Sequence, residues 1–112
     1  MKPALAVMLG GAVGTLARAG VAHALPVTPG AWPWATLLVN LLGTAILAWV
    51  VAADRWRPLV GTGFCGALTT FSTFQVELVH LADDGHGALA AAYLAVSVTA
   101  GLAAAELGRK LA

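Results

Sequence analysis

A cluster of hydroxyl side chains in the third quarter of the chain is the stretch best suited to bind an ion. Four hydroxyls fall within five positions and are interleaved with two phenylalanines: Thr69, Thr70, Ser72, Thr73, Phe71 and Phe74. A hydroxyl group can donate a hydrogen bond to an anion, and the edge of an aromatic ring is partially positive. The cluster therefore predicts a pathway for an anion that contains no charged side chain.

The run that carries this cluster is apolar from Pro58 to Val76 and meets its first charge at Glu77. Gly61, Gly63 and Gly66 lie upstream of the hydroxyls, and glycine weakens a helix. Ser and Thr hydroxyls also compete for backbone hydrogen bonds and bend helices. The run is long enough to cross a bilayer, and its composition predicts a helix that is broken near its centre. Non-helical backbone at that depth is tolerated only inside protein or beside a wet cavity.

Two further segments carry polar residues at helical spacing. Thr36, Asn40 and Thr44 recur every four residues, so they share one helix face. The Asn40 amide either makes an interhelical hydrogen bond or offers its donors to an anion in a pore. A second stripe, formed by Tyr93, Ser97 and Gly101, serves either close packing or the far wall of the same pathway.

Composition places these stripes in a membrane. The chain has 112 residues, of which 60% are hydrophobic and 10% charged, whereas a soluble domain carries about a quarter charged residues. The net charge of +1 comes without a basic run that would bind nucleic acid. Cys65 is the only cysteine, which excludes an intrachain disulfide. We find no nucleophile–base pair and no cluster of metal ligands, so an enzyme is not expected.

Four apolar segments account for most of the length and predict one all-α membrane domain over residues 1–112 with four transmembrane helices. The predicted spans cover residues 3–25, 31–53, 58–82 and 87–107, because about 20 apolar residues are needed to cross a bilayer. Arg18 lies inside the first span. It serves either as an anchor at the headgroups or as a buried contact.

Basic residues outside the spans lie on one side of this topology: Lys2, Arg55, Arg57, Arg109 and Lys110. The loops of the other side hold none, and Asp83 and Asp84 are found there. The positive-inside rule then predicts that both termini are cytoplasmic.

Three motifs in order give the chain a resemblance to the Fluc (CrcB) family of bacterial fluoride channels. They are residues 10–18 (GGAVGTLAR), residues 36–40 (TLLVN) and residues 63–74 (GFCGALTTFSTF), and the third is the most diagnostic. The chain departs from the family pattern at Ala19, Ala35 and Ala67, and none of these positions carries a polar group of the predicted pathway.

This resemblance implies an antiparallel dimer in the bacterial inner membrane that exports fluoride passively and lowers its cellular concentration. It implies pores lined by Asn40, Phe71, Phe74, Ser97, Tyr93 and Thr36. Supporting positions would be Arg18, Glu77, Thr70, Ser72 and Thr73. A structural sodium ion is expected at the dimer centre, held by the backbone carbonyls of Gly66 and Thr69.

The charge bias raises a question about the partner. A subunit that pairs with an inverted copy of itself must insert in both orientations, and five basic residues against none oppose this. The hypothesis is a subunit that inserts one way and pairs with an oppositely biased homologue. A homodimer with unusual tolerance of the bias stays open.

Two rival functions remain. A proton-coupled exporter of the small multidrug resistance type has a similar length, but it needs a carboxylate in its first helix. This chain has no Asp or Glu before Asp54. A non-transporting membrane assembly protein would use the polar stripes for packing alone.

Overall fold

Helices make up almost all of the computed structural model, which describes residues 1–112 and contains no β-strand. The three long helices are α1 (Pro3–Ala24), α2 (Trp34–Ala53) and α5 (Gly87–Leu111). Each of them is long and apolar enough to cross a membrane. The predicted all-α class is confirmed, and the chain is a multi-pass membrane protein.

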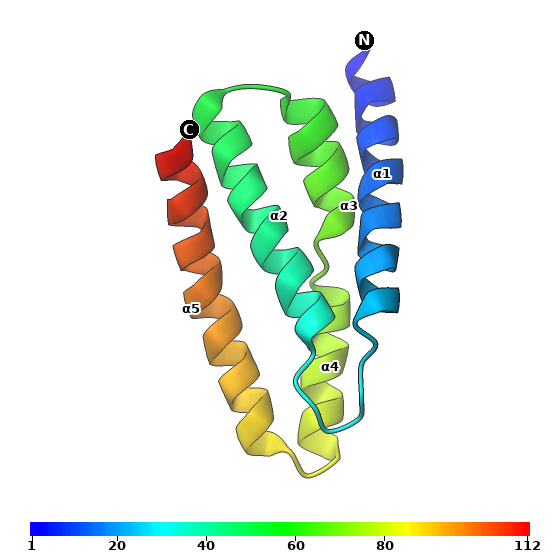
Figure 1. Ribbon diagram of the computed structural model, residues 1–112, viewed down its shortest axis with the longest axis vertical. Helices are drawn as coiled ribbons and strands as arrows, with labels where there is room; N and C mark the ends of the chain where they lie inside the picture. Colours follow the sequence, from blue (N-terminus) through cyan, green and yellow to red (C-terminus); the bar gives the residue numbers. More distant parts are fainter.

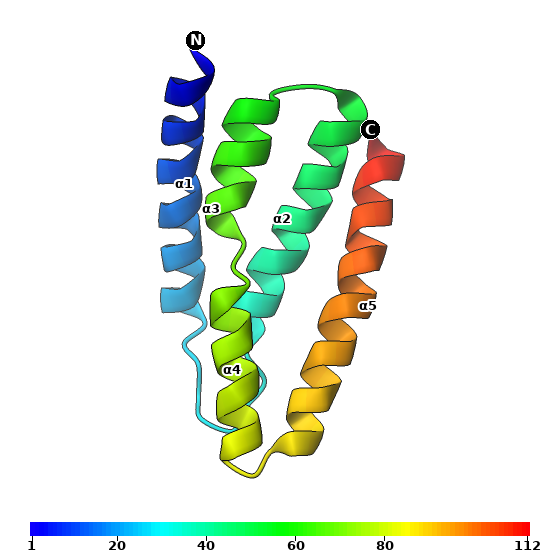
Figure 2. The same ribbon diagram turned by 180° about the vertical axis from the view of Figure 1, so that it is seen from behind.

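The remaining membrane segment consists of shorter helices. A π-helical segment, η1 (Arg57–Cys65), leads into a short helix, α3 (Gly66–Leu68), and helix α4 (Ser72–Asp83) follows. Residues 69–71 between α3 and α4 are not helical, and Thr69 has an extended backbone with φ −80° and ψ 155° (Figures 1 and 2). None of these pieces alone reaches the ~20 residues that a spanning helix requires.

Helix α1 packs closely on η1 because the two α1 residues that face the η1 backbone, Gly10 and Gly14, are glycines. A Cβ atom added at Gly10 would overlap the carbonyl oxygen of Leu59, and one at Gly14 would overlap that of Phe64. Backbone atoms cannot move aside as a flexible side chain can, so these two positions admit only glycine. The close helix approach expected of a small-xxx-small face is therefore present within the chain.

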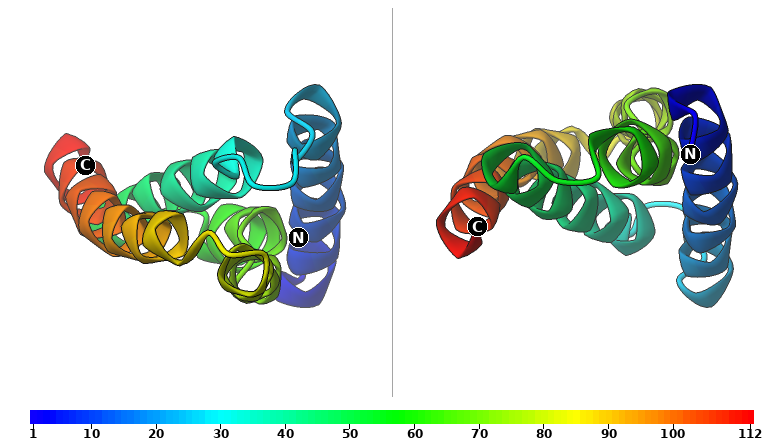
Figure 3. Two further views of the ribbon diagram at one scale, coloured as in Figure 1. Left: turned by 90° about the horizontal axis from the view of Figure 1, so that it is seen from below. Right: turned by 90° about the horizontal axis from the view of Figure 1, so that it is seen from above.

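The helices form a flattened bundle in which α1 and α5 lie at opposite edges (Figure 3). Helix α1 packs mainly on η1 and α3, whereas α2 packs mainly on α5. Helix α4 contacts α5 beyond the interruption. The long dimension of 49 Å is comparable to the ~40–45 Å of a whole bilayer.

Both chain termini and the link between α2 and η1 lie at one end of the bundle (Figure 1). The links between α1 and α2 and between α4 and α5 lie at the other end. Each end carries a tryptophan pair, Trp49 with Trp56 and Trp32 with Trp34. Aromatic side chains of this kind are enriched at membrane–water interfaces.

Two helix boundaries differ from the predicted spans. Helix α2 begins at Trp34 rather than at residue 31, because Pro33 disfavours a helical backbone at the residue before it. Helix α5 continues to Leu111 rather than ending at residue 107. Its last turn extends beyond the apolar run because Glu106 pairs with Arg109 and with Lys110 on the exposed face.

Candidate functional site

An open cavity of about 390 Å³ lies beside the interruption, lined by residues of α2, α5 and the segment that runs from η1 through α3 to the start of α4. We call it the trough, and its lining includes Asn40, Thr44, Thr69, Thr70, Phe71 and Ser97. These residues come from the middle of α2, the middle of α5 and the non-helical residues 69–71. The trough therefore places polar groups near the centre of the membrane-spanning region.

The Asn40 side chain holds the interruption in place. Its Nδ2 donates a hydrogen bond to the backbone oxygen of Thr70 at 3.0 Å, and the Thr70 backbone N–H donates to Asn40 Oδ1 at 2.8 Å. These two bonds satisfy both backbone polar groups of a residue that helix geometry leaves unpaired. The interhelical use of Asn40 foreseen in the sequence is present, and one amide hydrogen remains for another acceptor.

Other polar groups of the trough lack a partner within the chain. The Ser97 hydroxyl is buried and makes no hydrogen bond. The backbone oxygens of Gly66 and Thr69 accept none either, because the helix stops before the residues that would donate to them. Thr69 and Thr44 instead turn their hydroxyls back to the carbonyls of Cys65 and Asn40. The residues that line the trough thus hold two free donors, the Ser97 hydroxyl and the remaining Asn40 amide hydrogen, and two free acceptors.

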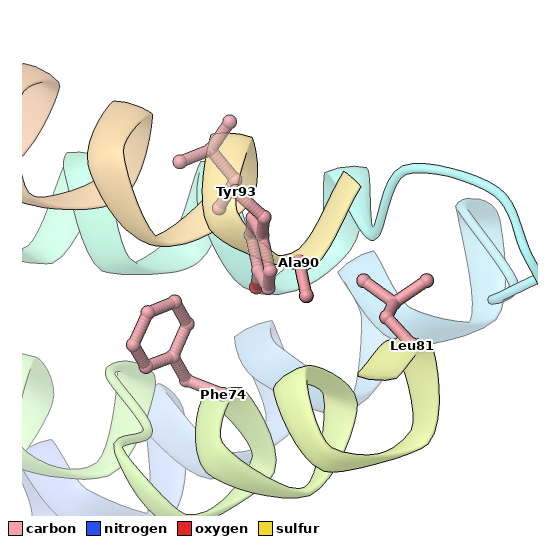
Figure 4. Packing of buried hydrophobic residues seen from close by; sticks show 5 residues of the cluster. Phe74, Leu81, Ala90 and Tyr93 are labelled. Carbon is pink, nitrogen blue, oxygen red and sulfur yellow. The ribbon is translucent and has the colours of Figure 1, made fainter. Parts of the chain in front are cut away.

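The two phenylalanines that flank this region have different surroundings. Their ring centroids lie 6.3 Å apart, but Phe71 is 70% exposed and Phe74 only 8%. The Phe74 ring meets Tyr93 edge-on with centroids 5.0 Å apart (Figure 4). Phe71 precedes the first residue of α4 and borders the trough. Phe71 is therefore on the open side of the trough, whereas Phe74 lies between the trough and the buried core.

A buried carboxyl group lies on the other side of Phe74. Glu77 accepts a hydrogen bond from Thr36 Oγ1 through Oε2 and another from the Tyr93 hydroxyl through Oε1, each at 3.0 Å. All three residues are at most 8% exposed. We call them the carboxyl cluster. Because it joins α2, α4 and α5 and leaves neither carboxyl oxygen unpaired, it is a closed structural network.

Arg18 belongs to neither of these sites, although it shares a hollow with one residue of each. It borders a hollow of about 100 Å³ together with Thr36, Thr70 and Thr73. The side chain makes no ion pair, and its residue is half-buried on α1. Arg18 thus lies near Thr70 and Thr73, on the α1 side of the interruption, and does not border the trough.

The predicted pore residues fall into two groups in the structure. Asn40, Phe71, Phe74 and Ser97 border the trough, together with Gly66, Thr69 and Thr70. Thr36 and Tyr93 instead belong with Glu77 in the carboxyl cluster. Ser72 and Thr73 are exposed at the start of α4 and do not border the trough.

Six residues that border the trough are not among the predicted pore, supporting or metal residues: Gly43, Thr44, Leu47, Gly61, Cys65 and Val98. For Thr44 the signal was present, because it follows Asn40 by one helical turn on the same face. For Cys65 no signal was available, since small buried residues occur throughout a membrane core. Cys65 is 2% exposed and is one of the residues that border the trough.

Comparison with known proteins gives a consistent result. Residues 5–109 match the family model described as CrcB-like protein, Camphor Resistance (CrcB). A protein of Mycobacterium tuberculosis named fluoride-specific ion channel FluC 1 is 46% identical, with 95% of this chain and 86% of that protein covered. Its namesake from Mycolicibacterium paratuberculosis is 45% identical over the same shares. A FluC 2 from Symbiobacterium thermophilum is 40% identical and covers 95% of this chain and 94% of its own length.

Proposed function

Since the chain belongs to the CrcB family, we propose that it is a fluoride channel that passively exports fluoride across the bacterial inner membrane and so lowers the cellular concentration. The resemblance found from the three motifs is confirmed. The family consists of channels, which agrees with the expectation that the chain is not an enzyme. The observation that carries the proposal is the match over 95% of the chain to relatives named fluoride-specific ion channels.

The trough supports this proposal because its free groups suit a small hydrated anion. Ser97 offers an unpaired hydroxyl, and Asn40 keeps one amide hydrogen after its bonds to Thr70. Phe71 adds an exposed aromatic ring whose edge attracts anions. Conduction requires sites strong enough to replace water and weak enough to release the ion. Neutral donors meet this requirement better than a charged side chain in the same place.

The open trough also supports an antiparallel dimer. Unpaired polar backbone at membrane depth is tolerated only where protein or a wet cavity covers it. A partner related by an axis in the membrane plane would bring its own central trough against this one, because the trough lies midway along α2 and α5. The two chains together would enclose the pathway that one chain leaves open.

A structural sodium ion fits the free carbonyls at the centre of this arrangement. The oxygens of Gly66 and Thr69 accept no hydrogen bond, and oxygen ligands suit a hard cation. Gly66 is also exposed, and an added Cβ there would meet nothing within 4 Å, so a second chain has room to approach. Sodium would fix the two chains at their interruptions and supply a positive charge near the pathway.

Fluoride efflux from liposomes tests the proposal. Vesicles loaded with potassium fluoride or potassium chloride contain either this chain alone or this chain with a co-expressed homologue of opposite charge bias. A potassium ionophore starts the release, and ion-selective electrodes measure both anions. Release of fluoride without chloride in either arm supports the proposal. Failure of both arms to release fluoride would falsify it.

A further inference from the structure

The methyl group of Thr69 occupies a space on α2 that exists because residue 43 is glycine. A Cβ atom added at Gly43 would overlap Thr69 Cγ2, and it would lie 3.7 Å from both Leu68 Cδ2 and Thr69 Cβ. Gly43 is buried in the middle of α2 and borders the trough. Other closely approached glycines face backbone oxygens instead: Gly10, Gly14, Gly63 and Gly108. Gly43 is thus distinguished by receiving a side chain of the interruption.

Thr69 cannot turn its methyl group away without losing a hydrogen bond. Its Oγ1 donates to the Cys65 carbonyl oxygen at 2.9 Å, and its backbone N–H donates to the same oxygen at 3.1 Å. Threonine carries its hydroxyl and methyl groups on one carbon and is stiff at χ1, so fixing the hydroxyl also fixes the methyl group. An atom added at Gly43 must therefore either break the hydroxyl bond or push the backbone of Thr69 away from α2.

The next residue of the chain is held on α2 by Asn40, one helical turn before Gly43. Asn40 accepts a hydrogen bond from the Thr70 N–H at 2.8 Å and donates one to the Thr70 oxygen at 3.0 Å. Residues three apart on a helix are neighbours on one face, so α2 contacts two successive residues of the interruption from adjacent turns. The backbone is extended at Thr69, and these contacts fix the direction in which the chain continues toward α4.

We infer that Gly43 is a positioning residue for the ion pathway: by admitting the Thr69 methyl group, it sets how closely the interruption lies against α2. Gly43 has no side chain to offer an ion and acts through Thr69 and Thr70. The free backbone oxygen of Thr69 and the exposed ring of Phe71 take their places at the trough from this contact. The inference rests on the channel function proposed above. Its consequence is that transport depends on residues 43 and 69 as a pair.

A double-mutant cycle of Gly43→Ala and Thr69→Ser tests this dependence, in the arm of the liposome assay in which the parent chain conducts. Gly43→Ala should slow fluoride release at least about tenfold, because the added methyl group displaces Thr69. Thr69→Ser keeps the hydroxyl that bonds Cys65 and removes only the methyl group. Alone it should slow release about threefold, through the lost contact with Gly43.

The double variant gives the decisive rate. Thr69→Ser makes room for the atom added by Gly43→Ala, so the double variant should release fluoride as fast as Thr69→Ser alone. That rate is at least about threefold above the rate of Gly43→Ala. A double variant no faster than Gly43→Ala overturns the inference, because a general packing role of Gly43 would not depend on the side chain at residue 69.

Gly20→Ala is the matched control for replacing a helical glycine. It adds the same methyl group to α1, at a position where an added Cβ meets nothing within 4 Å. Fluoride release should stay within about twofold of the parent rate. A tenfold loss in this variant as well would overturn the inference, because the loss would follow from any such replacement and not from the contact with Thr69.

Hydrogen exchange of the Thr70 amide gives a measurement that does not depend on transport. Its N–H is protected by the bond to Asn40, so a displaced interruption should expose it. By NMR in detergent micelles, the Thr70 amide should exchange about tenfold faster in Gly43→Ala than in the parent, and the double variant should reverse this. The amides of α5 report whether each variant is folded. If Gly43→Ala does not fold, recovery of those amides in the double variant supports the inference, and no recovery overturns it.

The two proposals fail in different ways. If the parent chain releases no fluoride in either arm while exchange at Thr70 follows the expected pattern, the channel function is wrong and Gly43 still positions the interruption. If the parent conducts but exchange and release in Gly43→Ala match the parent, only the role of Gly43 is wrong.

Discussion

The trough and the carboxyl cluster lie on either side of Phe74, and they differ in whether their polar groups have hydrogen-bond partners within the chain. In the carboxyl cluster, both oxygens of Glu77 are bonded and no member is more than 8% exposed. In the trough, the Ser97 hydroxyl and two backbone oxygens have no partner, and Phe71 is 70% exposed. Polar groups satisfied within one chain stabilise that chain. Those left unsatisfied at membrane depth are available to an ion and to a second subunit.

The largest effect on stability is expected from removing Glu77, which both other members of the carboxyl cluster contact. Glu77→Ala deletes two hydrogen bonds to a carboxyl group and leaves the Thr36 and Tyr93 hydroxyls buried without a partner. We expect a loss of about 3 kcal/mol in the free energy of unfolding. Denaturation in detergent micelles, followed by tryptophan fluorescence to which Trp32 beside Tyr93 contributes, measures it.

The matched control is Glu106→Ala. Its carboxylate also pairs with two residues, but all of them are exposed at the end of α5. Exposed ion pairs contribute little, so the change should stay within about 0.5 kcal/mol. Equal losses for the two variants would mean that the carboxyl cluster is not a buried network.

The second test concerns Asn40, which borders the trough and also bonds the backbone of Thr70. Asn40→Ala leaves the N–H and C=O of Thr70 unpaired, at an expected cost of about 2 kcal/mol. Fluoride efflux should be lost as well, because the interruption is no longer held. Asn40→Asp keeps the acceptor for the Thr70 N–H but turns its second carboxylate oxygen toward the Thr70 carbonyl oxygen, so it should cost at least as much as the alanine change. Its negative charge should also abolish efflux, and efflux retained by either variant would show that Asn40 neither holds the interruption nor faces the anion.

The two phenylalanines sharpen the boundary between the regions. Phe74→Leu removes the edge-on contact with Tyr93, which we expect to cost about 1 kcal/mol. Phe71→Leu removes a ring that is 70% exposed and should cost less than about 0.5 kcal/mol. Parallel efflux measurements should show the reverse order, with the larger loss for Phe71→Leu. If both variants lose the same stability and the same efflux, the two rings do not belong to different regions.

How much of this could be predicted from the sequence depends on the kind of contact. Hydropathy predicted helices of spanning length, and one-turn spacing placed Asn40 and Thr44 on the same face, where the structure has them bordering the trough. Local spacing carries this information because a helix repeats regularly. The π-helical geometry of η1 had no comparable signal in the sequence.

Spacing alone could not say which helix covers which part of a face. Tyr93 and Ser97 are one turn apart on α5, yet Tyr93 is fully buried against α4 and Ser97 borders the trough. The difference arises because α4 packs on α5 only beyond the interruption, and the earlier residues of that span lie nearer α1 (Figures 1 and 3). The same cause brought Thr36 to Glu77 rather than to the trough. Partners 41 residues apart depend on the path of the whole chain.

The smallest change in stability should come from Ser97→Ala, and it gives the finest test of the comparison. The hydroxyl has no partner to lose, so the free energy of unfolding should change by less than about 0.5 kcal/mol. Fluoride efflux should fall about fivefold, which corresponds to the ~1 kcal/mol of one hydrogen bond to the passing ion. Thr99→Val is the matched control on the same helix, because its hydroxyl is exposed and bonds the Ala95 carbonyl. It should leave efflux unchanged, whereas an unchanged rate in Ser97→Ala would show that an unpaired hydroxyl beside the interruption is not on the ion's path.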